Sequence, residues 1–208
     1  MSRYTGPDCR LCRRAGDKLF LKGERCFTPK CGVERRRTPP GQQSQRRRRT
    51  SDRGTQLREK QKVKVTYGVS ERQMHTYYEA AMKNPQSTLQ VLMQLLEQRL
   101  DNVVYRLDFA ESRDQARQLV RHGHFTVNGR KVDIPSYKVK PQDVVVWKQG
   151  SQDKEFVKAL LDGIPRKAVP SWLSLDATNL TGRVIRMPEE QDIEMTIEPR
   201  LIVEYYSK

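Results

Sequence analysis

The sequence contains no apolar run long enough to cross a bilayer, no apolar core near its start of the kind that marks a secretory signal, and no visible lipidation motif. We therefore expect a cytoplasmic protein that neither spans nor is anchored to a membrane. Cysteine is also scarce, and all four cysteines lie within the first 31 residues. In a reducing compartment such a small set is more typical of a metal site than of a disulfide framework.

The groups that enzymes use most often are scarce as well. The chain has three histidines, and it contains neither a phosphate-binding glycine loop nor a Gly-x-Ser-x-Gly turn. The local sequence places no carboxylate or nucleophile beside His122 or His124. We expect no catalytic residue, no small-molecule substrate and no enzymatic activity.

Positive charge is abundant and unevenly distributed. The formal net charge is +15, and residues 1–66 carry 20 Lys and Arg against 6 Asp and Glu, a net +14. The remaining residues are nearly balanced, at +1. Such a basic arm supplies sequence-independent affinity for phosphate groups. An anionic membrane surface is the competing partner, but the lack of any membrane signal favours nucleic acid.

The cysteines form two pairs, Cys9-x2-Cys12 and Cys26-x4-Cys31. Four thiolates complete a tetrahedral zinc site with no open position, which is typical of a structural site. We expect one Zn²⁺ that folds a segment with little apolar content of its own. Two disulfides or an iron–sulfur cluster are the alternatives. Nearby cations are expected to lower the thiol pKa values: Arg10, Arg13, Arg14, Lys18, Lys22 and Arg25.

A short helix followed by a hairpin is predicted between residues 112 and 132. Ser112 and Gln115 match a capping box, Gly123 is a helix stop, and Asn128-Gly129 is a strong hairpin signal. Ala116, Leu119 and Val120 give the helix an apolar face, with three arginines on another. Guanidinium groups suit phosphate oxygens, so we interpret the unit as a reader of the RNA backbone. Its cationic and polar candidates are Arg113, Arg117, Arg121, His122, His124, Arg130, Lys131, Lys138 and Lys140.

Other segments have clear local patterns. Residues 36–56 have almost no apolar content and are expected to be extended. Hydrophobic spacing predicts helices near 57–65, 70–84, 87–100 and 155–162, and strands near 143–147, 183–187, 195–197 and 201–206.

The tripeptide Arg99-Leu-Asp101 resembles the catalytic tripeptide of pseudouridine synthases that carry a similar RNA-binding module. Those enzymes place a large catalytic domain after the module, whereas here the tripeptide comes before it and only about 70 residues follow. We therefore interpret Asp101 as a helix-end or ion-pair residue. An RNA-modifying enzyme and a zinc-dependent, DNA-directed regulator are kept as alternative hypotheses.

Many motifs in one order carry a resemblance that covers the whole chain. The chain resembles the S4 family of small-subunit ribosomal proteins, in its zinc-binding bacterial branch. Besides the cysteines and residues 112–135, the resemblance rests on Arg3-Tyr-Thr-Gly-Pro7, Pro39-Pro-Gly41, Leu57-Arg-Glu-Lys-Gln61, Tyr67-Gly-Val-Ser-Glu-Arg-Gln73, Arg99-Leu-Asp-Asn-Val-Val-Tyr-Arg-Leu107, Trp172-Leu-Ser-Leu-Asp176 and Tyr205-Tyr-Ser-Lys208.

The resemblance implies an α+β fold in three parts. Residues 1–43 form a zinc-bound basic arm, and residues 44–97 form an all-helical domain that binds ribosomal RNA. Residues 98–187 form the helix-hairpin RNA-binding module with an antiparallel sheet. The segment from about 188 to 208 is expected to pack near the helical domain.

The resemblance also implies a role in the small ribosomal subunit. The family binds small-subunit (16S) rRNA early, at a junction in its 5′ domain, and nucleates subunit assembly. It lies beside the channel through which messenger RNA enters, where residues matching Arg46–Arg49 are associated with unwinding, and its contact with protein S5 influences translational accuracy. In the basic arm and helical domain the candidate RNA-binding residues are Arg10, Arg13, Arg14, Arg35, Arg36, Arg37, Arg46, Arg47, Arg48, Arg49, Arg58, Lys60 and Lys62.

Overall fold

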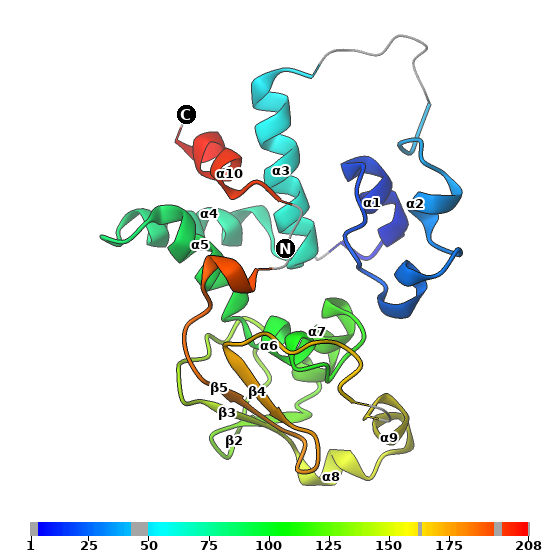
Figure 1. Ribbon diagram of the computed structural model, residues 1–208, viewed down its shortest axis with the longest axis vertical. Helices are drawn as coiled ribbons and strands as arrows, with labels where there is room; N and C mark the ends of the chain where they lie inside the picture. Colours follow the sequence, from blue (N-terminus) through cyan, green and yellow to red (C-terminus); the bar gives the residue numbers. More distant parts are fainter. Residues whose placement is uncertain (1–3, 43–49, 162–163, 194–196, 208) are drawn as a thin grey trace. The chain divides into compact units, whose positions relative to one another are not determined.

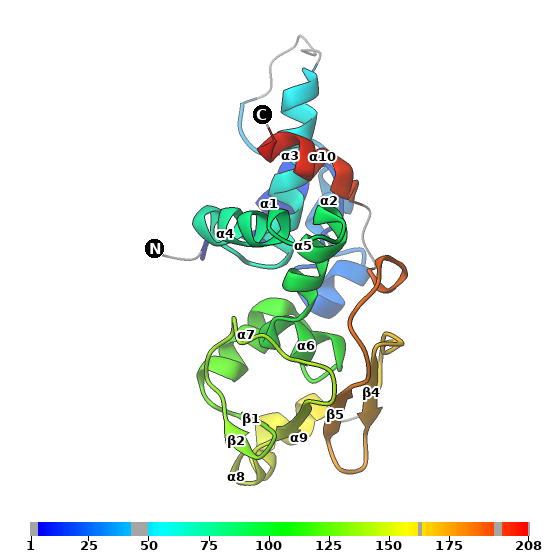
Figure 2. The ribbon, with the colours of Figure 1, turned by 90° about the vertical axis from the view of Figure 1, so that its left-hand side faces the viewer.

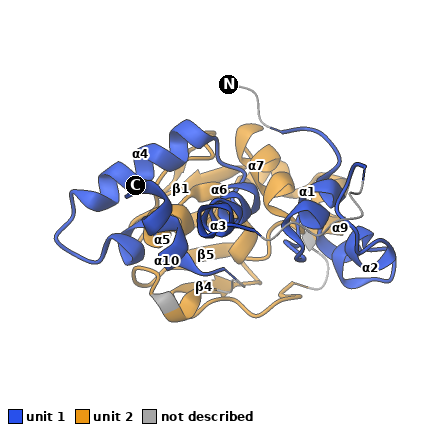
Figure 3. Ribbon diagram, turned by 90° about the horizontal axis from the view of Figure 1, so that it is seen from above, with its two compact units in different colours: residues 1–92, 195–208 blue, residues 93–194 orange. Residues whose placement is uncertain are grey.

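Helices make up the first part of the chain, and helices with an antiparallel sheet make up the second, which confirms the α+β class expected from the sequence. The computed structural model describes residues 4–42, 50–161, 164–193 and 197–207. The chain divides into two compact units, Met1–Leu92 with Met195–Lys208 as unit 1, and Met93–Glu194 as unit 2 (Figure 3). No helix of the described residues is both long and apolar enough to cross a membrane.

Unit 1 is built from short helices around the cysteines and longer helices after them (Figure 1). Ser51 and Ser70 begin α3 and α4, because each hydroxyl accepts a hydrogen bond from the backbone N–H three residues later, at 3.2 Å. The predicted helices near 57–65 and 70–84 are therefore confirmed, the first beginning earlier than expected. The elements are α1 (Asp8–Ala15), η1 (Gly23–Phe27), α2 (Gly32–Arg35), α3 (Asp52–Thr66), α4 (Glu71–Met82), α10 (Pro199–Tyr206) and the start of α5 (Thr88–Glu97).

The last helix, α10, returns to pack against α3 within unit 1 (Figure 2). The strand predicted at 201–206 is therefore wrong. Its β-branched and aromatic residues resemble a strand, but Pro199 starts a helix and Ile202 and Tyr206, four residues apart, fall on one helical face. Ile202 is fully buried, and Tyr206 stacks on Tyr78 with ring centroids 4.9 Å apart.

Unit 2 contains a five-stranded antiparallel sheet with the strand order β2-β1-β3-β5-β4. The predicted strand near 143–147 is confirmed as β3, whereas β4 was not predicted and β5 ends three residues earlier than expected. The predicted strand at 195–197 lies mostly outside the described residues. The elements are α6 (Leu100–Arg106), α7 (Arg113–Arg121), β1 (Phe125–Val127), β2 (Arg130–Lys131), β3 (Val144–Trp147), α8 (Gln149–Gln152), α9 (Glu155–Leu161), β4 (Leu173–Asp176), β5 (Thr181–Val184) and η2 (Glu190–Asp192).

The predicted helix-hairpin is confirmed, with one difference in its cap. Asn128 and Gly129 have φ angles of 50° and 77°, as a two-residue turn between β1 and β2 requires. Ser112 accepts from the N–H of Gln115 at 3.3 Å, but the Gln115 side chain accepts from the N–H of Glu111 at 2.8 Å and not from that of Ser112. The cap thus also holds the turn that precedes α7.

The core of unit 2 lies between the sheet and the paired helices α6 and α7 (Figure 2). Phe109, Phe125 and Trp147 form an aromatic cluster there, with the Phe125 and Trp147 rings 4.5 Å apart. The residue that caps the end of α6, Leu107, approaches β5 closely: a Cβ added at Gly182 would lie 2.2 Å from one of its methyl carbons. Glycine at this strand position therefore lets the helix reach the sheet.

Replacing Gly182 by alanine should destabilise unit 2 by about 1–3 kcal/mol, because the added methyl overpacks the contact with Leu107. Denaturant unfolding followed by tryptophan fluorescence tests this, since both tryptophans, Trp147 and Trp172, are buried in unit 2. Gly150→Ala is the matched control, because nothing lies within 4 Å of its added Cβ. An equal effect at both glycines would contradict the packing argument.

Candidate nucleic-acid interface

Two buried carboxylates organise the polar contacts of α6 and α7. Glu97 is fully buried and receives both Nε (3.1 Å) and one terminal nitrogen (2.9 Å) of Arg106. Its carboxylate also accepts from the side-chain amide of Asn102 at 2.7 Å. Charge is tolerated inside the unit because each oxygen is matched by a donor.

The second carboxylate, Asp101, stands in the first turn of α6 and is 4% exposed. Arg99 donates to both of its oxygens, at 3.0 and 2.7 Å, and Arg117 of α7 donates to one of them at 3.1 Å. Asp101 is therefore both a helix-end and an ion-pair residue, which confirms the interpretation made from the sequence.

The arginine row on α7 is partly held by these groups. Arg113 donates through Nε to Asn102 at 2.8 Å, and its guanidinium lies 4.4 Å from the ring centroid of Tyr105. Arg117 is held by Asp101, whereas Arg121 is exposed. The apolar face predicted for this helix is confirmed, since Ala116, Leu119 and Val120 are buried. Arginines held in this way keep their positions when they meet a phosphate.

Further cations lie at the two ends of α7. At its C-terminal end, a Cβ on Gly123 would lie 2.3 Å from Cε of Lys131, so the lysine of β2 extends over the helix stop. At the other end Lys167 lies 4.6 Å from the Tyr105 ring that also contacts Arg113. Lys167 was missed from the sequence because it belongs to a loop with no periodic pattern.

Backbone pairing fixes the segment that carries Lys138. Leu100 and Asp101 donate their N–H groups to the carbonyls of Tyr137 and Pro135, at 2.9 and 3.1 Å. Lys138 stands opposite Arg99 in an isolated antiparallel bridge. The exposed residues Arg130, Lys131, Lys138 and Lys140 thus belong to the same unit as the arginine row.

The two histidines after α7 differ in their surroundings. His122 is exposed, but His124 is buried beside Trp147, and its Nδ1 lies 2.9 Å from the hydroxyl of Ser151. Burial, with a smaller effect from nearby Lys154, lowers the pKa of His124. This interior position corrects the expectation that His124 donates to RNA, because its ring is packed against the core.

The structure also corrects the expectation that two lysines of α3 bind RNA. Lys60 is 3% exposed, binds Glu71 at 2.6 Å and lies 4.8 Å from the ring centroid of Tyr205. Lys62 is buried between Asp17 at 2.5 Å and Glu59 at 2.7 Å. Both charges are paired with carboxylates of unit 1. The spacing of residues along α3 does not reveal these partners.

The remaining candidates of the basic arm have simpler surroundings. Arg13 is half-buried and donates to the carbonyl of Thr38 at 2.9 Å. Arg46, Arg47, Arg48 and Arg49 lie outside the described residues. The exposed candidates are Arg10, Arg14, Arg35, Arg36, Arg37 and Arg58.

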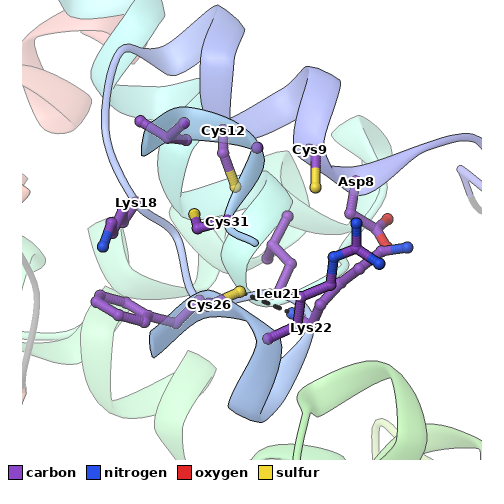
Figure 4. A pocket seen from close by; sticks show the side chains of 12 residues that line it. Asp8, Cys9, Cys12, Lys18, Leu21, Lys22, Cys26 and Cys31 are labelled. Atoms are coloured by element: carbon purple, nitrogen blue, oxygen red, sulfur yellow. Dashed lines mark hydrogen bonds and ion pairs between the residues drawn. The ribbon is translucent and has the colours of Figure 1, made fainter. Parts of the chain in front are cut away.

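The four cysteines line one pocket formed by α1, η1 and the start of α2 (Figure 4). All four thiols are free, and Cys12, Cys26 and Cys31 are buried. The backbone N–H of Lys22 donates to Sγ of Cys26 at 3.4 Å. Within the described ranges, no three potential ligands are gathered closely enough to hold a metal ion, but the donor chemistry and shared pocket fit zinc.

The thiol pKa values correct one expectation. Burial raises the pKa of Cys12 to about 11, and mutual repulsion with the other three thiolates adds to this. Burial also raises the pKa of Cys26, although Lys18 acts in the opposite direction. The basic neighbours therefore do not lower these values as expected, because loss of hydration outweighs their attraction.

Comparisons with known proteins cover the whole chain. Residues 3–97 match the ribosomal protein S4/S9 N-terminal domain family, and residues 98–145 match the S4 domain family. The chain is 54% identical to small ribosomal subunit protein uS4 of Geobacter sp. (strain M21), covering 100% of both chains. It is 52% identical to that of Thermus thermophilus and 51% identical to that of Heliobacterium modesticaldum, again over 100% of each.

Burial of neutral His124 should make the stability of unit 2 depend on pH. The folded chain holds the pKa of His124 below its ordinary value of 6.5, so the unfolded chain binds a proton first as pH falls. We expect the free energy of unfolding to have its full value above pH 6.5 and to decrease as the pH falls below that value. His124→Asn should remove this decrease, measured by tryptophan fluorescence during denaturant unfolding.

Exposed His122 provides the matched control. His122→Asn should leave the pH dependence almost unchanged, because its ring is exposed in the folded chain. A pH dependence that survives in the His124 variant but disappears in the His122 variant would contradict this prediction.

Proposed function

We propose a function from the premise that this chain belongs to the ribosomal protein S4 family, as its full-length matches show. It is a structural constituent of the small ribosomal subunit and not an enzyme. Its S4 domain binds RNA, so ribosomal RNA and ribosomal proteins are its partners.

The finer proposal is that the chain is a primary binder of 16S rRNA that nucleates subunit assembly at a junction in the 5′ domain. The observation that carries it is the anchoring of Arg113 and Arg117 by Asn102 and Asp101. Side chains already ordered before binding lose less conformational entropy when they meet phosphates. A junction brings several strands together, so fixed guanidinium groups can distinguish its shape from that of a simple duplex.

Both units contribute to this proposed contact. Unit 2 offers the row on α7 with Lys131 and Lys167, while unit 1 carries most of the net positive charge. Contacts linked in one chain raise the effective concentration of each other, so several moderate contacts give tight binding. Early binding follows, because a partner that engages several strands stabilises their folded arrangement.

Further roles follow from the resemblance. We propose that Arg46, Arg47, Arg48 and Arg49 face the channel through which messenger RNA enters, where a dense cluster of guanidinium groups favours single strands by phosphate contact. We also propose a contact with protein S5 that influences translational accuracy. These positions and contacts are inferred from the family and not from the geometry.

One structural Zn²⁺ held by Cys9, Cys12, Cys26 and Cys31 completes the proposal. The ion would cross-link α1, η1 and α2, elements too short to form a core of their own. Since burial raises the thiol pKa values of Cys12 and Cys26, metal binding would release protons from these groups.

Removing exposed cations of unit 2 should flatten the salt dependence of rRNA binding. For Arg121→Gln combined with Arg130→Gln, we expect the slope of log affinity against log salt to fall by about 1.4–1.8, at about 0.7–0.9 per phosphate contact. The measurement is binding to a 5′-domain rRNA fragment at several salt concentrations. Arg183→Gln with Lys158→Gln removes equal charge from exposed positions of the same unit and should change the slope less. Equal changes would indicate only a net-charge effect.

Zinc content tests the metal proposal directly. Under reducing purification we expect about one zinc per chain by elemental mass spectrometry, and loss of that zinc in Cys12→Ser. Chelation should unfold the cysteine region while the fluorescence of Trp147 and Trp172, both in unit 2, is retained. Two disulfides without metal, or iron in place of zinc, would refute the proposal.

A further inference from the structure

We propose that Phe20 and Phe27 form a stacking platform for an unpaired base of the bound RNA. The proposal rests on the proposed rRNA binding and deepens it by adding a contact that does not depend on charge. The two rings are stacked, with centroids 5.0 Å apart and an interplanar angle of 27°. Phe20 is 37% exposed and Phe27 is 65% exposed, so part of each side chain is accessible to a ligand.

The exposure of this pair contrasts with that of three tyrosines in the helical part of unit 1. Tyr67, Tyr77 and Tyr78 are each less than a tenth exposed. Exposing two adjacent phenylalanine rings is unfavourable in the free chain, because apolar surface in water raises its free energy. An exposed apolar patch of this kind, bordered by polar groups, marks a site of interaction.

The backbone at Phe20 supplies a second observation. Its φ angle is 49°, in the left-handed region that bulky side chains rarely adopt. The preceding residue, Leu19, is buried, so the chain turns at this point and leaves the Phe20 ring at the surface. Strained conformations are concentrated at functional sites, and here the strain accompanies an exposed ring.

Cations beside the pair identify the chemistry of the ligand. Phe20 lines the same pocket as Lys18, Lys22 and Arg25. Lys18 is paired with Glu34, and Lys22 lies 3.6 Å from Asp8. Arg25 is exposed, and its guanidinium takes part in none of the hydrogen bonds or ion pairs among the described residues. An aromatic face next to available positive charge suits a nucleotide, whose base stacks while its phosphate meets the cation.

The nucleotide must be unpaired. Bases inside a duplex are stacked on each other and expose only their edges, whereas loops, bulges and junctions release bases that can stack on protein rings. The occupant is therefore a base at an irregular position of the structured rRNA. An apolar protein side chain would use the ring surface but would leave the charge of Arg25 unmatched.

Conservative variants separate stacking from charge. Phe27→Leu and Phe20→Leu keep apolar volume but remove the π-face, while Phe27→Trp keeps it. With full-length protein prepared with zinc and a 5′-domain rRNA fragment, we expect each leucine variant to bind at least about 5-fold more weakly and the tryptophan variant to bind like the parent. The salt slope should stay unchanged in Phe27→Leu and fall by about 0.7–0.9 in Arg25→Gln.

The control is Phe156→Leu, because Phe156 is also strongly exposed, at 51%, but belongs to unit 2. Circular dichroism and zinc content establish that the variants are folded. Ultraviolet crosslinking of the parent complex, followed by mass spectrometry, should give a peptide containing Phe20 or Phe27 joined to one nucleotide.

The outcomes distinguish this inference from the proposed function. Failure of the parent protein to bind the fragment would refute rRNA binding itself. Parental affinity in both leucine variants, alongside the expected loss in Arg121→Gln with Arg130→Gln, would reject the platform alone. Nucleotide crosslinks found only in peptides that lack both Phe20 and Phe27 would likewise overturn it, since the stacked base would then lie elsewhere.

Discussion

Burial of the Asp101 and Glu97 carboxylates is the constraint on which the arrangement of unit 2 depends. A carboxylate inside a protein is tolerated only if its charge is matched by donors, and here the donors come from different elements. Arg99 and Arg117 meet Asp101, so the beginning of α6 is tied to α7. Arg106 meets Glu97 and ties the end of α6 to the end of α5. The same bonds that satisfy the buried charges therefore fix the helix that carries the proposed RNA contacts.

The same principle in unit 1 shows why a count of cations does not identify a binding surface. Burial alone would raise the pKa of Glu71, but hydrogen bonds from Lys60, Tyr206 and Lys64 hold it below its usual value. Lys60 thereby helps attach α10 to the helices α3 and α4. In a chain with a net charge of +15, some cations stabilise the fold and others are available to a partner. Burial together with a partner separates the two groups, since Lys60 is buried in its ion pair whereas Arg117 stays partly exposed in its own.

Local signals were predictable from the sequence, whereas contacts between distant residues were not. Ser112 and Asn128-Gly129 act through neighbouring backbone, and the cap and turn are where the sequence places them. The nature of residues 201–206 depends on packing against α3, so β-branched residues alone gave the wrong element. His124 and Lys62 were misjudged for the same reason, since Ser151 and Asp17 are distant in sequence. Hydrophobic periodicity describes a single helix or strand. Whether a charged side chain is available to a partner depends on all the elements that pack around it.

Selectivity cannot come from the charge of the basic arm alone. A net +14 over residues 1–66 attracts any polyanion, and that attraction weakens as salt rises. Choosing one RNA requires contacts with fixed geometry or contacts that do not scale with charge. Arg113 and Arg117 meet the first requirement because Asn102 and Asp101 hold them before binding. An aromatic pair beside the cysteine pocket meets the second, because stacking persists where phosphate attraction is screened. Charge then brings the RNA to the chain, and fixed geometry and stacking determine which RNA stays bound.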